Sequence, residues 1–156
     1  MPSIAPDKAA LMPSDQQGLP VSGKSVLIIE DEALIALSVE SCLLAAGAAV
    51  VKIANSISAS QSALDEGIPF DTAIVDLYLG DDNAYPLVQI LSERGIPVVI
   101  TTGDEIDLGD PALSYAVAFL QKPHADSELI EALIEWAVPP PHQGPLRSRA
   151  SRSGKV

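Results

Sequence analysis

The sequence predicts a single α/β domain in which a doubly wound, five-stranded parallel sheet carries helices on both faces. Short apolar runs alternate with helix-like segments from residue 25 to residue 137. Aromatic residues make up only 4% of a chain that is 47% hydrophobic, so most of the core consists of small apolar side chains. Such side chains suit a sheet that is buried on both faces. At 156 residues the chain has the length of one domain.

The first half of the domain is expected to contain three strands and two helices. Each helix-like segment has apolar residues at helical spacing and is followed by a glycine, Gly47 or Gly67, which commonly ends a helix. The strands are expected at 25–30, 48–54 and 72–75, and the helices at 32–46 and 56–66.

The second half continues the alternation with one weak element. After a polar loop at 81–83, a helix begins with Pro86 in its first turn and closes at Arg94. Residues 103–115 have a helical pattern only around 111–115, so the fourth helix is predicted to be short or mobile. Asp126 is expected to cap the last helix. The remaining elements are strands at 97–101 and 116–121 and a helix at 127–137.

Composition and charge divide the chain into a folded domain at 24–138 and two extensions. Residues 25–137 hold 19 acidic side chains and three basic ones, so the domain should repel nucleic acid. Residues 1–23 are predicted to be a flexible extension. Residues 139–156 are rich in Pro, Ser and Arg, carry four basic and no acidic residues, and read as disordered. A solvated tail is favoured over an arm that binds an acidic partner or the domain itself.

Cysteine content and hydropathy indicate a cytoplasmic protein. Cys42 has no partner cysteine, so a disulfide framework is excluded. No apolar run approaches the roughly 20 residues that span a bilayer. The segment Met1–Ile4 lacks a basic region followed by an apolar one, so neither secretion nor a membrane anchor is expected.

One motif match is rejected because its context is inverted. Residues 18–25 read G-L-P-V-S-G-K-S, which matches the phosphate-binding loop of nucleoside triphosphatases. That loop requires a strand before it and a helix after it. Here polar residues precede the match and a strand follows it, so a flexible linker is the interpretation that we favour.

Four of the five expected strands end on side chains that suit phosphoryl chemistry. Glu30 ends the first strand and Asp31 follows it, while Asp76 follows the third strand, Thr102 the fourth and Lys122 the fifth. Because parallel strands bring their carboxyl ends to one edge of the sheet, these side chains should converge. Each has a structural alternative: a helix cap for Asp31, a loop residue for Asp76. Two carboxylates at two strand ends nevertheless favour a site.

The residue types indicate what such a site would do. Asp31 and Asp76 could share Mg²⁺, which prefers oxygen ligands, and Glu30 would add charge through a water. A carboxylate such as Asp76 can also attack phosphorus to form an acyl phosphate. Lys122 would supply an ammonium group and Thr102 a hydroxyl to the phosphoryl oxygens. The alternatives are a solvated surface lysine and a β-branched strand residue.

This set of residues resembles the receiver domain of bacterial two-component response regulators over about residues 24–138. The resemblance implies that a histidine kinase or histidine phosphotransfer protein donates a phosphoryl group to Asp76. It also implies that Tyr78 offers its backbone carbonyl to Mg²⁺ and that the Lys122-Pro123 peptide is cis. The domain is then a signalling module rather than an enzyme, with at most slow self-catalysed dephosphorylation.

The resemblance extends to a switch and to a subtype. Phe119 matches the aromatic switch position that works with Thr102, although it is phenylalanine rather than tyrosine and could simply be a core ring. Residues 76–80, 85–87 and 98–104 are similar to the single-domain FAT GUY regulators of alphaproteobacteria, in which the fourth helix is short or mobile. A switch based on Phe119 would work by packing, because the ring has no hydroxyl.

Several functional alternatives stay open at this point. A stand-alone receiver can signal through contacts with an unknown downstream protein, as a monomer or weak dimer, or act as a phosphate sink. A pseudo-receiver that binds partners without phosphorylation is the main rival. A phosphohydrolase with an aspartyl nucleophile is less favoured, because Tyr78 stands where a general acid is needed.

The first expected helix has more apolar surface than one core-facing stripe needs. Leu34, Leu37 and Leu44 lie off the face that carries its other apolar residues. Packing of these leucines against the last helix is the interpretation that we favour. The resemblance implies the alternative, a docking surface for the helical hairpin of a kinase.

Overall fold

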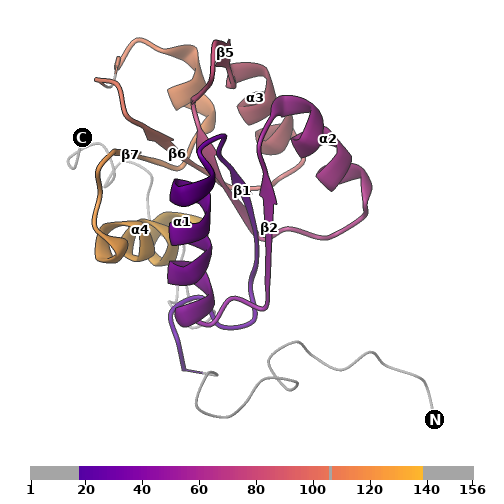
Figure 1. Cartoon of the computed structure of the whole chain (residues 1–156), viewed down its shortest axis with the longest axis vertical. Helices are drawn as coiled ribbons and strands as arrows, with labels where there is room; N and C mark the ends of the chain where they lie inside the picture. The colour runs from indigo at the N-terminus through magenta and orange to yellow at the C-terminus, as the bar shows by residue number, and fades with distance from the viewer. Residues whose placement is uncertain (1–17, 106, 139–156) are drawn as a thin grey trace.

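The structure, a computed structural model, describes residues 18–105 and 107–138 (Figure 1). Residues 1–17 of the extension predicted at 1–23, and the tail at 139–156, lie outside the described residues. The predicted five-stranded parallel sheet is confirmed, with the strand order β2-β1-β3-β6-β7. Its strands are β1 (Ser25–Ile29), β2 (Val50–Ala54), β3 (Thr72–Asp76), β6 (Val98–Thr102) and β7 (Ala118–Gln121).

Helices cover both faces of the sheet, as expected for a doubly wound fold. In Figure 1, α1 and α4 lie on one side of the strands and α2 and α3 on the other. The helical elements are α1 (Ala33–Ala45), α2 (Ile57–Asp65), α3 (Tyr85–Glu93), the 3₁₀ helix η3 (Pro111–Tyr115), α4 (Asp126–Ala132) and its π-helical continuation η4 (Leu133–Ala137). None of the helices in the described ranges is long and apolar enough to cross a membrane.

Two apolar cores sandwich the sheet because side chains alternate along each strand. In β1, Val26 and Ile28 belong to the core under α1 and α4. Leu27 and Ile29 belong to the core under α2 and α3. All four side chains are at most 1% exposed. The central strands are therefore apolar runs in the middle, and their polar residues stand at the first position or at the last two positions.

The fourth helix is short, as predicted. Among the described residues between β6 and β7, the one helical element is the five-residue 3₁₀ helix η3. A carboxylate oxygen of Asp110 accepts a hydrogen bond from the Ala112 amide at its start. A 3₁₀ helix this short covers little of a sheet. The edge strand β7 consequently has side chains that are only partly buried or exposed.

The loop after β3 contains a small hairpin, where the sequence predicted only a polar loop. Strands β4 (Tyr78–Leu79) and β5 (Asp82–Asn83) pair antiparallel. Gly80, with a φ of 61°, stands in the two-residue turn between them. A two-residue turn of this kind favours glycine because the backbone is left-handed there.

The segment before β1 is part of the folded unit, although we expected a flexible extension as far as residue 23. Val21 is fully buried, and its amide donates a hydrogen bond of 2.9 Å to the Ala46 carbonyl. Gly47 has a φ of 101°, and a Cβ at this position would lie only 2.9 Å from Leu19 Cβ. The turn after α1 and the segment around Val21 therefore pack against each other.

The rejected phosphate-loop match has the context that the sequence predicted. Residues 18–23 form turns, and β1 begins at Ser25. No helix follows the match, so its amides do not form a helix N-terminus.

The predicted cap of the last helix is wrong by one residue. Ala125, with an extended backbone, is the N-cap of α4, and Asp126 lies in the first turn. The amide of Ala125 donates to Glu128 Oε1 at 3.0 Å, so the glutamate side chain replaces the expected aspartate cap. At the other end, the Val138 amide donates to the Leu133 carbonyl at 2.7 Å, which gives the wide turn of η4.

Packing of the surplus leucines of α1 against the last helix, which we favoured, is wrong. Leu34, Leu37 and Leu44 are 83%, 50% and 48% exposed. The buried side chains of α1 are Ala36, Cys42 and Leu43. One side of α1 thus meets the core and α4, while the leucines form a separate exposed stripe.

Candidate functional site

The predicted site residues come together at the carboxyl edge of the sheet. β1, β3, β6 and β7 are consecutive neighbours, so their ends lie side by side. Glu30 directly follows β1, Asp76 ends β3, Thr102 ends β6 and Lys122 directly follows β7. Glu30, Asp76 and Thr102 are buried, at 4%, 7% and 3% exposed. Rigid strand ends therefore hold the polar side chains in a largely desolvated place.

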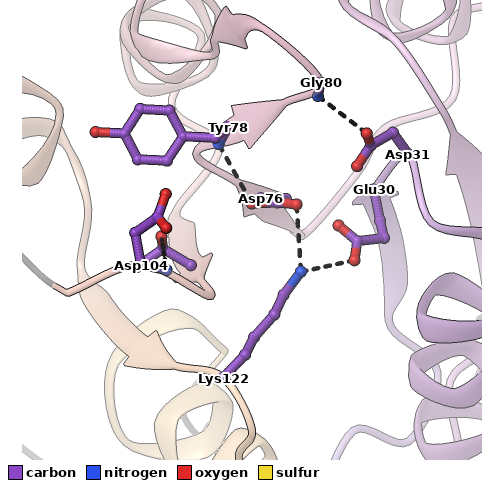
Figure 2. A network of polar contacts seen from close by, with 8 residues as sticks. Glu30, Asp31, Asp76, Tyr78, Gly80, Asp104 and Lys122 are labelled. Carbon is purple, nitrogen blue, oxygen red and sulfur yellow. Dashed lines mark hydrogen bonds and ion pairs between the residues drawn. The ribbon is translucent and has the colours of Figure 1, made fainter.

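Lys122 connects two of the carboxylates (Figure 2). Its Nζ donates to Glu30 Oε1 at 2.6 Å and to Asp76 Oδ2 at 3.2 Å. The Lys122 amide also donates to the Thr102 carbonyl at 2.7 Å, which fixes the backbone from which the side chain extends. The predicted cis peptide between Lys122 and Pro123 is confirmed.

Glu30, Asp31 and Asp76 form an acidic cluster. One carboxylate oxygen of each lies within 4.8 Å of the others. Asp31 is exposed, and its Oδ2 accepts a hydrogen bond of 2.9 Å from the Gly80 amide. Among the described residues, Glu30 Oε2 is a buried oxygen without a hydrogen-bond partner. A buried carboxylate oxygen without a partner is costly, and a hard cation in the cluster would satisfy it.

Burial and mutual repulsion perturb the charges of this cluster. Burial, together with the adjacent Asp76 carboxylate, raises the pKa of Glu30 to about 8, and the Lys122 ammonium only partly opposes this. Burial acts to lower the pKa of Lys122, but its hydrogen bond to Glu30 and the charges of Asp76 and Glu30 outweigh burial, so that this pKa is raised. At neutral pH the lysine is charged, and Glu30 without a cation favours its protonated form.

Asp76 is held by one hydrogen bond at each carboxylate oxygen. Oδ1 accepts from the Tyr78 amide at 3.2 Å, and Oδ2 accepts from Lys122. The Tyr78 side chain is exposed, and in Figure 2 its ring points away from the acidic cluster. A carboxylate with a fixed orientation beside an ammonium group can act as an oxygen nucleophile toward an anionic electrophile.

Thr102 and Phe119 line one narrow crevice. Both side chains line it, together with Tyr78 from the hairpin. Thr102 Oγ1 accepts a hydrogen bond of 3.1 Å from the Asp104 amide, which holds the start of the following loop. Phe119 is partly buried and packs against the core under α2 and α3. The structure thus places the two predicted switch residues next to the same small space.

Two contributors were not assigned a role from the sequence. Gly80 supplies the amide that holds Asp31, and the signal for it was the glycine-aspartate pair between two short strands. Asp104 supplies the amide that holds Thr102, but a backbone donor in an irregular loop leaves no trace in the sequence pattern.

No family model and no curated protein sequence matches this chain. Solved structures do match, among them several response regulator receiver domains. A CheY-like response regulator receiver domain from Methylobacillus flagellatus is 26% identical, covers 72% of this chain and 97% of that chain, and has a TM-score of 0.63. A CheY-like receiver domain from Methanospirillum hungatei JF-1 is 25% identical, with 73% and 93% covered and a TM-score of 0.64.

A receiver domain from Clostridium thermocellum is 21% identical, with 74% of this chain and 94% of that chain covered and a TM-score of 0.64. The fold is therefore the flavodoxin-like receiver fold, and the neighbours are response regulator receiver domains. These similarities do not separate subtypes of receiver, so the FAT GUY subtype stays a prediction.

Proposed function

We propose that this protein is a receiver that accepts a phosphoryl group on Asp76 from a histidine kinase or histidine phosphotransfer protein. The observation that carries the proposal is the position of Lys122 Nζ, within 3.2 Å of Asp76 Oδ2, beside an acidic cluster at the carboxyl edge of a receiver fold. This combines a nucleophile, a fixed cation and oxygen ligands for a metal in one place. The proposed compartment is the cytoplasm.

In the transfer step, an Asp76 carboxylate oxygen attacks the phosphorus of a phosphohistidine. The new P–O bond forms as the P–N bond breaks, and the bonding electron pair leaves with the imidazole nitrogen, which then takes up a proton. Lys122 donates a hydrogen bond to Asp76 Oδ2 in the unphosphorylated protein, so its ammonium group is positioned to neutralise charge on the phosphoryl oxygens. The product is an acyl phosphate on Asp76.

The acidic cluster suits Mg²⁺ because all of its donors are hard oxygens. Glu30, Asp31 and Asp76 would hold the ion with the backbone carbonyl of Tyr78. The ion, when bound, offsets the charge that builds up between carboxylate and phosphoryl oxygens. The buried Glu30 Oε2, which has no hydrogen-bond partner among the described residues, supports this assignment.

The stripe formed by Leu34, Leu37 and Leu44 supports a helical partner. These leucines are 83%, 50% and 48% exposed on α1, the helix that begins three residues after Glu30. An apolar stripe along one helix fits the apolar groove of a helical hairpin in a kinase or phosphotransfer protein. Docking there would bring the donor histidine close to the carboxyl edge of the sheet.

Signal output is proposed to depend on Thr102 and Phe119. A phosphoryl group on Asp76 offers new acceptor oxygens to the Thr102 hydroxyl, which lines the same crevice as the Phe119 ring. Movement of the ring would change the surface of β7. The modified protein then acts through contacts with a downstream protein or, with no such partner, as a phosphate sink.

The chemical nature of the product tests this function. After incubation with a small phosphoryl donor and Mg²⁺, borohydride reduction converts an aspartyl phosphate into homoserine, which peptide mass spectrometry locates. Homoserine at position 76 is the expected result. Homoserine at position 31, or none at all with phosphate on a serine or threonine, would contradict the proposal.

A further inference from the structure

A groove lies between η3, the edge strand β7 and the last helix. Its volume is about 260 Å³. Apolar side chains form its floor, including Leu113, Phe119, Leu120 and Trp136. The groove exists because η3 is too short to cover β7, so that the side chains of Ala118–Leu120 are only partly buried.

One wall of the groove is acidic. Glu128, Glu131 and Glu135 all line it from α4 and η4. Their spacing of three and four residues puts them on one helix face, along roughly 10 Å of its length. The carboxylate of Glu128 also caps α4. The groove therefore offers an apolar floor beside a row of carboxylates.

The size and chemistry of the groove favour an extended chain segment over a small molecule. Ligand pockets usually measure about 300–1,000 Å³ and enclose most of the ligand, whereas this groove is smaller and only partly enclosed. It has room for one or two apolar side chains, and its acidic wall selects neighbouring cations. A segment with an apolar residue next to several arginines satisfies both demands.

Residues 139–156 have this composition, and in the sequence they come directly after a helix that lines the groove. They follow directly on Val138, two residues after Trp136 of the groove floor. They contain Leu146 and no acidic residue, and their cations are Arg147, Arg149, Arg152 and Lys155. From residue 139 to Arg147 the chain can span up to roughly 30 Å, which is more than the length of α4 and η4 together.

We propose that residues 139–156 dock into this groove of their own chain, with Leu146 on the apolar floor and the arginines along Glu128, Glu131 and Glu135. The contact buries part of the β7 surface and covers one face of Phe119, which lines both the groove and the crevice at Thr102. The tail competes there with any downstream protein that binds β7. The docking itself requires no phosphorylation.

The fluorescence of Trp136 reports on the groove directly, because the chain contains one tryptophan and residues 139–156 contain no aromatic residue. The experiment compares the full-length protein with the triple variant Arg147→Ser, Arg149→Ser, Arg152→Ser. In low salt, the variant should have red-shifted emission and stronger quenching by acrylamide than the wild type. Raising NaCl to about 1 M, where the Debye length is roughly 3 Å, should remove this difference.

Variants of the acidic wall provide the second part of the fluorescence experiment. Glu131→Gln with Glu135→Gln should reproduce the effect of the triple variant, while Glu128 is kept because it caps α4. Asp65→Asn, on the exposed surface of α2, is the matched control and should leave the emission unchanged. Equal emission and quenching in the wild type and the triple variant would overturn the proposal. A difference that disappears on dilution would also overturn it, because the tail would then occupy the groove of a second copy.

Discussion

Lys122 is placed between two buried acidic side chains, Glu30 and Asp76. Its Nζ donates hydrogen bonds to Glu30 and Asp76, and all three side chains are at least four-fifths buried. The ammonium group therefore serves the fold as well as the proposed chemistry. A buried charge left without its partner is far more costly than an exposed one.

Replacing Lys122 with alanine should destabilise the metal-free protein. At neutral pH we expect a loss of about 1–3 kcal/mol in the free energy of unfolding, because buried Asp76 loses its cation and Glu30 loses its hydrogen-bond donor. Mg²⁺ should recover much of the loss. Urea unfolding with and without Mg²⁺ measures both effects. The control is Lys52→Ala, since Lys52 forms an exposed pair with Glu66 and its loss should cost at most about 1 kcal/mol. Equal losses for the two variants would contradict the structural role of Lys122.

The raised pKa of Glu30 predicts how metal binding depends on pH. This pKa is about 8 in the folded, metal-free protein, whereas the ordinary value for a glutamate, which applies to the unfolded chain, is 4.5. Folding therefore favours the protonated carboxyl. The resulting stability is present below pH 4.5 and is lost as the pH rises toward 8. Mg²⁺ must displace this proton, so its affinity should rise by up to about tenfold per pH unit below pH 8 and level off above it.

Calorimetric titration of Mg²⁺ at several pH values around 8 checks this dependence. Glu30→Gln is the control, because it removes the proton that the ion displaces and should flatten the pH profile near 8. A wild-type affinity that is constant between pH 6 and 9 would rule out Glu30 as the titrating group.

At the scale of single residues, the sequence located the charged groups but not their contacts. Strand endings were enough to bring Glu30, Asp76 and Lys122 to one edge, because parallel strands share a direction. The lysine bridge depends on the reach of a side chain from the end of β7, past β6, to the ends of β3 and β1, which no local pattern encodes. The cap of α4 was misplaced because Ala125 has no polar side chain, and the compensating Glu128 lies three residues later.

At the scale of elements, the β4–β5 hairpin holds Asp31 in place. Gly80 turns the chain with a left-handed backbone, and its amide bonds Asp31. We expect Gly80→Ala to cost about 1 kcal/mol of stability and to weaken Mg²⁺ binding, because alanine resists a positive φ. The nearest atom to a new Cβ is Asp31 Oδ2 at 4.0 Å, so the backbone rather than crowding causes the loss.

Gly80→Asn separates these causes, since asparagine tolerates a left-handed backbone. It should lose less stability than the alanine variant in chemical unfolding and bind Mg²⁺ nearly as well as the wild type. Equal losses in the two variants would mean that the backbone angle at residue 80 is not the origin of the effect.

The exposed leucines of α1 predict a partner-specific defect. Leu34→Glu with Leu37→Glu should abolish transfer from a phosphorylated kinase or phosphotransfer protein but leave labelling by a small donor unchanged. Leu108→Glu is the matched control, because Leu108 is 69% exposed but lies outside α1. Time courses with both donors provide the comparison. Normal transfer from the protein donor would show that it docks elsewhere.

Whether an element could be predicted depended on whether its signal was local. The helices that end at a glycine and the apolar strands were located to within about two residues. The 3₁₀ helix η3 was recognised from its weak pattern. The exposure of Leu34 could not be predicted, because it depends on how closely α4 packs beside α1.

At the scale of the whole molecule, acidic charge works against the compact state. Residues 25–137 carry 19 acidic side chains and three basic ones. Screening should therefore stabilise the protein, and we expect the urea midpoint to rise between low salt and about 0.3 M NaCl. An unchanged or lower midpoint would show that local ion pairs, such as those of Lys122, outweigh the net repulsion.

The overall topology was the most predictable property of this chain. Five alternations of strand and helix leave few right-handed arrangements, and the observed strand order is one of them. The beginning of the folded unit was less predictable. Val21 stands among turn-forming residues, and only the close packing beside Gly47 reveals that it belongs to the core.

Intact mass after incubation with acetyl phosphate tests the central claim most directly. The full-length wild type and Asp76→Asn are compared with and without Mg²⁺. We expect a gain of about 80 Da, one phosphoryl group, only in the wild type and only with Mg²⁺. The same gain in Asp76→Asn, or a gain that is independent of Mg²⁺, would contradict Asp76 as the phosphoryl acceptor of a metal-assisted site.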